Sequence, residues 1–174
     1  MSAETCVFVA GQPETSNVIF QMDFMKKAVE EAVQGVTNDD GGPFGAVIVR
    51  NGSIVATGHN MVLKTNDPTA HAEVTAIRNA CSALGTFDLH GCQLYTSCYP
   101  CPMCMGAALW SRVDAIYYAA TQDEAERSGF DDKAFYKFFE NPTSGGRCKL
   151  EQLRVKNTLE PFNQWQQKDS KIQY

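Results

Sequence analysis

Residues 44–57 read FGAVIVRNGSIVAT, two apolar runs separated by the dipeptide Asn51-Gly52. The runs Phe44–Arg50 and Ser53–Thr57 are rich in apolar and β-branched residues, which is typical of strands. Asn-Gly between two such runs is the strongest short-range signal for a β-hairpin with a two-residue turn. We therefore expect an antiparallel pair of strands here.

Helical and strand-like patterns alternate on both sides of this hairpin. The segments expected to be helical are residues 17–35, 71–84, 101–111 and 159–168, together with a short acidic segment after Asp123. Further strands are expected over residues 92–97, 115–119 and 149–155. Alternation of this kind predicts an α/β sandwich with a largely mixed sheet.

The composition is that of a globular chain. Its 174 residues are 44% hydrophobic and 20% charged, which suits one domain with a buried core. No apolar stretch reaches membrane-spanning length, and residues 1–11 lack the basic segment of an export signal. We expect a polar tail over residues 1–16, one domain over residues 17–174, a cytoplasmic location and no membrane partner.

The charge balance bears on the kind of partner. Fifteen Lys and Arg residues against twenty Asp and Glu residues give a formal net charge of −5. A surface that binds nucleic acid is usually basic, because it must neutralise phosphate groups. The acidic balance therefore argues against a nucleic-acid partner.

The cysteines favour a metal site over a disulfide framework. There are seven, an odd number, and Cys98, Cys101 and Cys104 lie close together. Without an export signal, clustered cysteines are better explained as metal ligands in a reducing compartment.

Two short motifs carry the chemistry. His71-Ala72-Glu73 and Pro100-Cys101-Pro102-Met103-Cys104 together fit the H-x-E…P-C-x-x-C signature of zinc-dependent nucleobase deaminases. A catalytic zinc takes three protein ligands and keeps a fourth position for water, so His71, Cys101 and Cys104 complete the protein's share. We expect His71 at a helix entrance, with Glu73 as the general base and not a ligand.

Other interpretations of these residues are possible. Cys101 and Cys104 alone also fit a thioredoxin-like redox pair, and with Cys98 they resemble part of an iron–sulfur motif. A structural zinc site would need a fourth ligand, either Cys98 or Cys81. These interpretations give Glu73 no role.

Longer runs carry a family resemblance. They are Gly41–Val49, Asn66–Ala76, Tyr95–Cys104, Gly129–Asp132 and the last residue, Tyr174. On these runs the chain resembles the cytidine-deaminase-fold guanine deaminases from about Phe24 onward. The resemblance implies a three-layer α/β/α sandwich with a mixed five-stranded sheet and one Zn²⁺ per subunit. It also implies a homodimer in which C-terminal segments, residues 159–174, exchange between subunits.

The resemblance further implies contacts with a purine. Phe44 would stack on the base, and Asn60 and the Ala72 backbone amide would hydrogen-bond to it. Phe44 could instead be a core residue, and Asn60 a turn residue.

Three more contacts are implied in the second half of the chain. Asp132 would contact the polar edge of the base, Trp110 would line the pocket and Tyr174 would close it. Asp132 could instead cap a helix, and Trp110 could be a packing residue. One position departs from the family pattern, because Tyr99 stands where relatives commonly carry Glu.

These features predict hydrolytic deamination of guanine to xanthine and ammonia. Glu73 would carry the proton between water, purine and leaving amine. Deamination of guanosine, of cytosine or of adenosine in tRNA is the enzymatic alternative, and a structural zinc-binding module is the non-enzymatic one.

Overall fold

The hairpin expected at Asn51-Gly52 is present and forms one side of a mixed sheet. The computed structural model describes residues 14–142 and 148–173. In it, β1 (Gly45–Arg50) and β2 (Ser53–His59) pair antiparallel. Both turn residues have positive φ, 52° at Asn51 and 72° at Gly52, as the favoured two-residue hairpin turn requires.

The sheet has the strand order β2-β1-β3-β4, where β3 is Cys92–Cys98 and β4 is Ala115–Ala120. β3 runs antiparallel to β1 and parallel to β4. A parallel pair needs a crossover, and α4 (Pro102–Trp110) supplies it. The expected mixed sheet is confirmed.

The expected number of strands is wrong, because the described part of the chain forms a sheet of four strands and not five. Residues 149–155, the expected fifth strand, have no regular secondary structure. Their apolar side chains Leu150, Leu153 and Val155 are exposed. A strand needs a hydrogen-bonding partner, and apolar spacing alone does not provide one.

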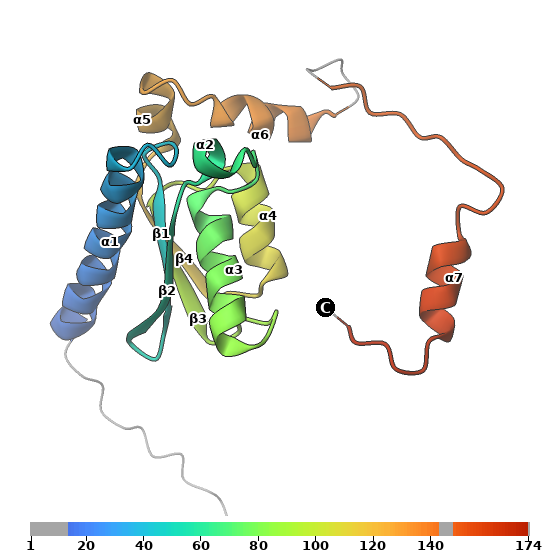
Figure 1. The fold of residues 1–174 in the computed structure, drawn as a ribbon, viewed down its shortest axis with the longest axis horizontal. Coiled ribbons are helices and arrows are strands. Elements are labelled where there is room, and N and C mark those ends of the chain that lie inside the picture. The colour runs from blue at the N-terminus through green and yellow to red at the C-terminus, as the bar shows by residue number, and fades with distance from the viewer. Residues whose placement is uncertain (1–13, 143–147, 174) are drawn as a thin grey trace, which may run out of the picture. The chain divides into compact units, whose positions relative to one another are not determined.

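Helices cover both faces of the sheet, which gives the expected three layers. α1 (Glu14–Thr37) lies against one face, and α3 (Ala72–Leu84) and α4 lie against the other (Figure 1). Side chains of β1 alternate between the two: Ile48 joins the core under α3 and α4, whereas Val47 and Val49 join the core under α1. α1 already begins at Glu14, inside the expected tail.

Two glycines let helices approach the sheet closely. A Cβ atom at Gly45 would lie 2.1 Å from the carbonyl oxygen of Ala28 in α1. A Cβ atom at Gly58 would lie 2.6 Å from the backbone nitrogen of Ala76 in α3. The second contact holds the end of β2 against α3, next to the candidate site.

Contacts divide the chain into two units, Met1–Thr121 and Gln122–Tyr174. The first contains the sheet and also a short helix, α2 (Val62–Thr65). The second contains α5 (Gln122–Arg127), α6 (Asp132–Glu140) and α7 (Glu160–Gln167). The patterns in the sequence predicted α5 and α7 but missed α2 and α6. Among the described helices, none is long and apolar enough to cross a membrane.

Candidate metal centre and active site

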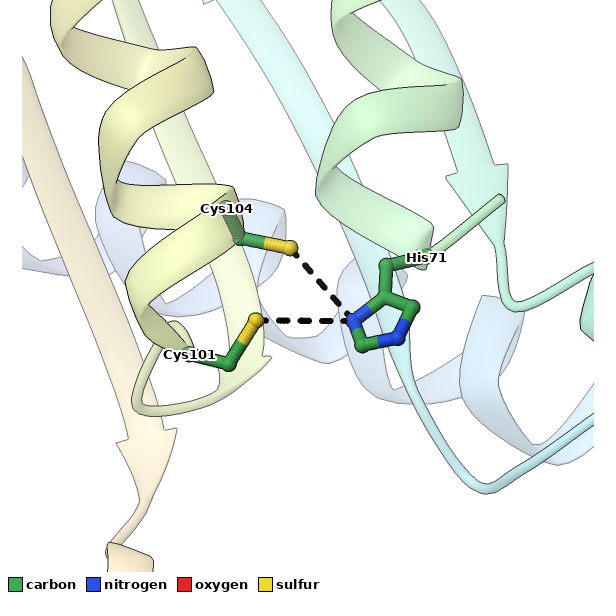
Figure 2. Close-up of side chains that lie close together, drawn as sticks. All are labelled: His71, Cys101 and Cys104. Atoms are coloured by element: carbon green, nitrogen blue, oxygen red, sulfur yellow. Dashed lines mark hydrogen bonds between the residues drawn. The ribbon is translucent and has the colours of Figure 1, made fainter. Parts of the chain in front are cut away.

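Three metal-ligand atoms come together where two helices begin. Nδ1 of His71 lies 3.6 Å from Sγ of Cys101 and 3.6 Å from Sγ of Cys104 (Figure 2). All three atoms lie within 4.8 Å of one another. Nitrogen and sulfur atoms bound tetrahedrally to one zinc ion lie about 3.5–3.8 Å apart. The donor set therefore fits zinc.

The local backbone explains how residues 30 positions apart meet. His71 is the N-cap residue of α3, with φ −69° and ψ 161°, and Cys101 is the N-cap residue of α4, with φ −67° and ψ 167°. Pro102 fits the first helical position because it lacks an N–H group. Cys104 lies one turn into α4. The prediction that His71 lies at a helix entrance is confirmed.

Both helices direct their positive ends at this place. The N-terminus of a helix carries a partial positive charge, which stabilises a nearby thiolate. A hydrogen bond with the Cys104 thiol lowers the pKa of Cys101 to about 4, and the same bond raises the pKa of Cys104. Cys101 is therefore ready to act as a thiolate ligand.

The site has a buried side and a more open side. Cys101 and Cys104 are buried, whereas His71 is only half-buried. Within the described residues, the candidate metal-ligand group contains these three residues and no fourth. This arrangement is typical of a catalytic zinc site with one open position, not of a closed structural site.

The other cysteines do not extend the ligand set. Cys98 Sγ donates to the carbonyl oxygen of Thr121 at 3.7 Å. Burial raises the pKa of Cys81 and of Cys92, which keeps both as thiols. No disulfide joins the six cysteines that the structure describes.

Glu73 adds a carboxyl group beside the ligands. It lies in the first turn of α3, is 5% exposed and hydrogen-bonds to the Cys104 thiol. Burial raises the pKa of this carboxyl above its usual range. A carboxyl that is surplus to the ligand set and whose pKa is raised by burial suits a proton carrier. A purely structural metal site would have no need of it.

Asn60 and Phe44, two predicted substrate contacts, are joined through their backbones. The Asn60 N–H donates to the Phe44 carbonyl oxygen at 3.0 Å, and the Val62 N–H donates to Oδ1 of Asn60 at 3.1 Å. The Asn60 side chain is thereby fixed, with its NH₂ group left to donate. Phe44 packs on the core cluster that contains Ala72, so both the core role and the stacking role fit its position.

Ala72 opens α3, and its side chain is fully buried. The first amides of a helix have no partner within the helix. The side chain of His71, the N-cap residue, makes no capping hydrogen bond to these amides. The Ala72 N–H is therefore a suitable donor beside His71 and Glu73.

The structure leaves three predicted substrate contacts untested. Trp110 ends α4, about 14 Å along the helix axis from Cys101, and is 67% exposed. It lines a hollow of about 370 Å³ with Gly106, Leu109 and Arg112. Asp132 begins α6 in the second unit. Tyr174 lies outside the described residues. Their substrate contacts stay predictions.

A cluster of charged side chains beside Asn60 was not predicted from the sequence. The Asp40 carboxylate lies 2.8 Å from His59 Nε2 and 2.8 Å from Lys64 Nζ, and the other nitrogen of His59 lies 3.5 Å from Glu31. The Asp40 carbonyl oxygen also accepts hydrogen bonds from the backbone of α2. The cluster ties α1, β2 and α2 together around Asn60. Its members lie on different elements, so no spacing in the sequence indicated it.

Comparisons with known proteins agree with this geometry. Residues 19–120 match a family model described as the cytidine and deoxycytidylate deaminase zinc-binding region. The chain is 49% identical over 151 residues to the guanine deaminase of Bacillus subtilis, covering 87% of this chain and 97% of that protein.

A solved structure and a second relative extend the comparison. The X-ray structure of guanine deaminase from Bacillus subtilis matches with a TM-score of 0.85 and 48% identity, covering 88% of this chain and 98% of that one. A tRNA-specific adenosine deaminase of Aquifex aeolicus is 34% identical over 142 residues, covering 82% of this chain and 91% of that protein.

Proposed function

Because the chain belongs to the cytidine and deoxycytidylate deaminase zinc-binding family, we propose that it catalyses the hydrolytic deamination of guanine to xanthine and ammonia. The observation that carries this proposal is the 49% identity to a guanine deaminase over 97% of that protein's length. The geometry of His71, Cys101, Cys104 and Glu73 supplies the chemistry that the reaction needs.

His71, Cys101 and Cys104 would hold one Zn²⁺ per subunit. Zinc at such a site supplies Lewis-acid activation of water. The thiolates and the imidazole stay in place throughout, because the two helix N-termini fix their backbone.

Glu73 moves the protons. Its carboxylate takes a proton from the attacking water and delivers it to the ring nitrogen beside C2. It then takes the proton of the hydroxyl group now on C2 and delivers it to the departing amine, which leaves a C2 carbonyl group. A C2–O bond forms, the bond from C2 to the exocyclic nitrogen breaks, and one water is consumed for each ammonia released. The burial of Glu73 keeps bulk water away from these transfers.

The substrate contacts extend this proposal. We assign Phe44 to stacking on the purine and the Asn60 side chain and Ala72 N–H to hydrogen bonds with it. Asp132, Trp110 and Tyr174 are proposed to complete the pocket. The fixed amide of Asn60 and the place of Ala72 at the start of α3 support the first group.

We propose further that two copies form a homodimer that works in the cytoplasm, with residues 159–174 exchanged between subunits. The exposure of Leu109 and Trp110 on α4, and of Phe162 on α7, supports association, because exposed apolar side chains favour contact with a partner surface. Three ligands that include two thiolates suit a reducing compartment.

A panel of substrates tests the function. Purified protein is given guanine, guanosine, cytosine, adenine and a tRNA anticodon stem-loop, and ammonia and products are quantified. We expect xanthine from guanine as the dominant product. A Glu73→Gln preparation serves as the blank for contaminating enzymes.

The second candidate is deamination of adenosine in tRNA, which the 34% identity to the Aquifex aeolicus relative favours. The formal net charge of −5 argues against a tRNA-binding surface. Faster deamination of the stem-loop than of guanine would make this candidate the better one.

A further inference from the structure

Glu73 has a partner on the sheet that lies outside the predicted site. Oγ1 of Thr96 donates a hydrogen bond to Oε1 of Glu73 at 3.2 Å. The Thr96 side chain is 1% exposed, so bulk water does not compete for this contact. The hydroxyl therefore contacts the one carboxyl group to which proton transfer is assigned.

The backbone of Thr96 is fixed on both sides. β3 lies between β1 and β4, and Thr96 pairs with Ala46 on one neighbour and with Tyr118 on the other. Threonine is also β-branched, so its χ1 angle has few alternatives. The hydroxyl is thus held on a rigid support, whereas a Glu side chain has three rotatable bonds.

The same hydroxyl reaches the segment that leads to the thiolate ligands. Oγ1 of Thr96 also lies 3.1 Å from the carbonyl oxygen of Cys98, three residues before Cys101. One hydroxyl hydrogen is shared between these two acceptors. Thr96 therefore connects Glu73 on α3 to the loop before α4.

We propose that Thr96 is a positioning residue for the reaction. Its hydroxyl holds Oε1 of Glu73, which leaves Oε2 to exchange the proton with water and substrate. This inference rests on the proposed function. Partners that orient a reacting group without touching substrate commonly contribute about 10- to 100-fold to activity.

Two substitutions of Thr96 test the inference. Thr96→Val removes the hydroxyl and keeps the shape, and Thr96→Ser keeps the hydroxyl. We expect Thr96→Val to lower kcat about 10- to 100-fold with KM changed less than about threefold and zinc content unchanged. Thr96→Ser should restore kcat to within about threefold of the unsubstituted chain. Zinc content and Tm are measured on each variant.

A matched control removes a different buried hydroxyl. Ser111 is buried and donates to the Ala108 carbonyl oxygen at the far end of α4. Ser111→Ala should lower Tm about as much as Thr96→Val while kcat stays unchanged. In a Glu73→Gln background, Thr96→Val should have no further effect on kcat, because the proton carrier that Thr96 positions is already lost.

The outcomes separate the inference from the proposed function. If the unsubstituted chain turns over guanine but Thr96→Val keeps its kcat, or Thr96→Ser loses as much as Thr96→Val, the positioning role is overturned and the function stands. If the unsubstituted chain deaminates no substrate of the panel, both are overturned.

Discussion

Glu73 and Cys104 are in contact, but their different roles should separate them on substitution. Glu73→Gln should keep one zinc per chain and lose about 10²- to 10⁴-fold in kcat, because an amide cannot carry the proton. Cys104→Ala should lose zinc, because two ligands remain of three. Elemental analysis and guanine turnover measure both effects.

The opposite results are equally informative. Near-normal turnover in Glu73→Gln would favour a structural zinc-binding module over an enzyme. Full zinc content in Cys104→Ala would mean that another thiol replaces Cys104, and Cys98 is the nearest candidate along the chain.

From the contacts of Asp40, we predict that the free energy of unfolding depends on pH. The hydrogen bond from Lys64, and next the one from His59, hold the pKa of Asp40 below its usual value. A carboxyl with a depressed pKa stabilises the fold fully above its unfolded pKa of about 3.9, and this contribution is lost as pH falls through the folded value. Asp40→Asn removes the contribution.

The difference in the free energy of unfolding between the unsubstituted chain and Asp40→Asn should be largest above about pH 5 and shrink below about pH 4. Urea unfolding of both proteins across this range measures it. Acid also releases zinc from thiolates, but equally in both proteins, so the difference isolates Asp40. A difference that stays constant down to pH 3 would contradict this explanation.

At the site, spacing along the chain determined what could be predicted. Cys101 and Cys104 lie one helical turn apart and Glu73 lies two residues from His71, and this motif spacing led to the expected ligands and base, whose roles stay predictions. Thr96 is 23 residues from Glu73, and the hydrogen bond depends on how β3 packs against α3. A lone hydroxyl in a strand carries no signal for such a contact.

Helix α3 carries His71 and Glu73 at its start. At its other end, we predict that a substitution changes the stability of the fold and not the turnover rate. Gly85 ends the helix with φ 66°, and its N–H donates to the Cys81 carbonyl oxygen. Gly85→Ala should lower the free energy of unfolding by about 1 kcal/mol, because a Cβ atom is strained in the left-handed region. Thermal or urea unfolding measures the loss.

Gly85→Asn is the matched control, because Asn tolerates this conformation better than Ala. It should lose less stability than Gly85→Ala, and both should keep the turnover rate, since Gly85 lies about 18 Å along the helix from Glu73. Equal losses in the two variants would show that the positive φ is not the cause. A steric clash is not expected in either variant, because no atom lies within 4 Å of the added Cβ position.

Elements with a strong local signal were predicted, and elements defined by their partners were not. The hairpin and α3 were found within a residue or two, since turn chemistry and apolar periodicity are properties of the segment itself. α2 is only one turn long, and its amides are held by the Asp40 carbonyl oxygen, a contact from outside the segment. Residues 149–155 show the reverse error, an apolar pattern without a strand to pair with.

At the scale of the whole molecule, apolar side chains on and after α7 in the second unit are exposed and not packed into a core. Phe162 and Ile172 are 65% and 67% exposed, and α7 has no buried residue. Apolar groups in this number are stabilised by docking on another surface. This favours a segment that covers a pocket over one that frays.

The last residues should therefore be needed for catalysis more than for folding. Deleting Lys171–Tyr174 should lower kcat/KM for guanine at least about tenfold, because an uncovered pocket admits water and loses the predicted contact of Tyr174 with the purine. Zinc content and Tm should stay nearly unchanged, since His71, Cys101 and Cys104 are untouched. Lys171→Ala is the control: it removes only an exposed hydrogen bond to the Gln166 carbonyl oxygen and should keep full activity. Unchanged kcat/KM in the deletion would contradict the covering role, and a large fall in Tm would show that these residues stabilise the fold instead.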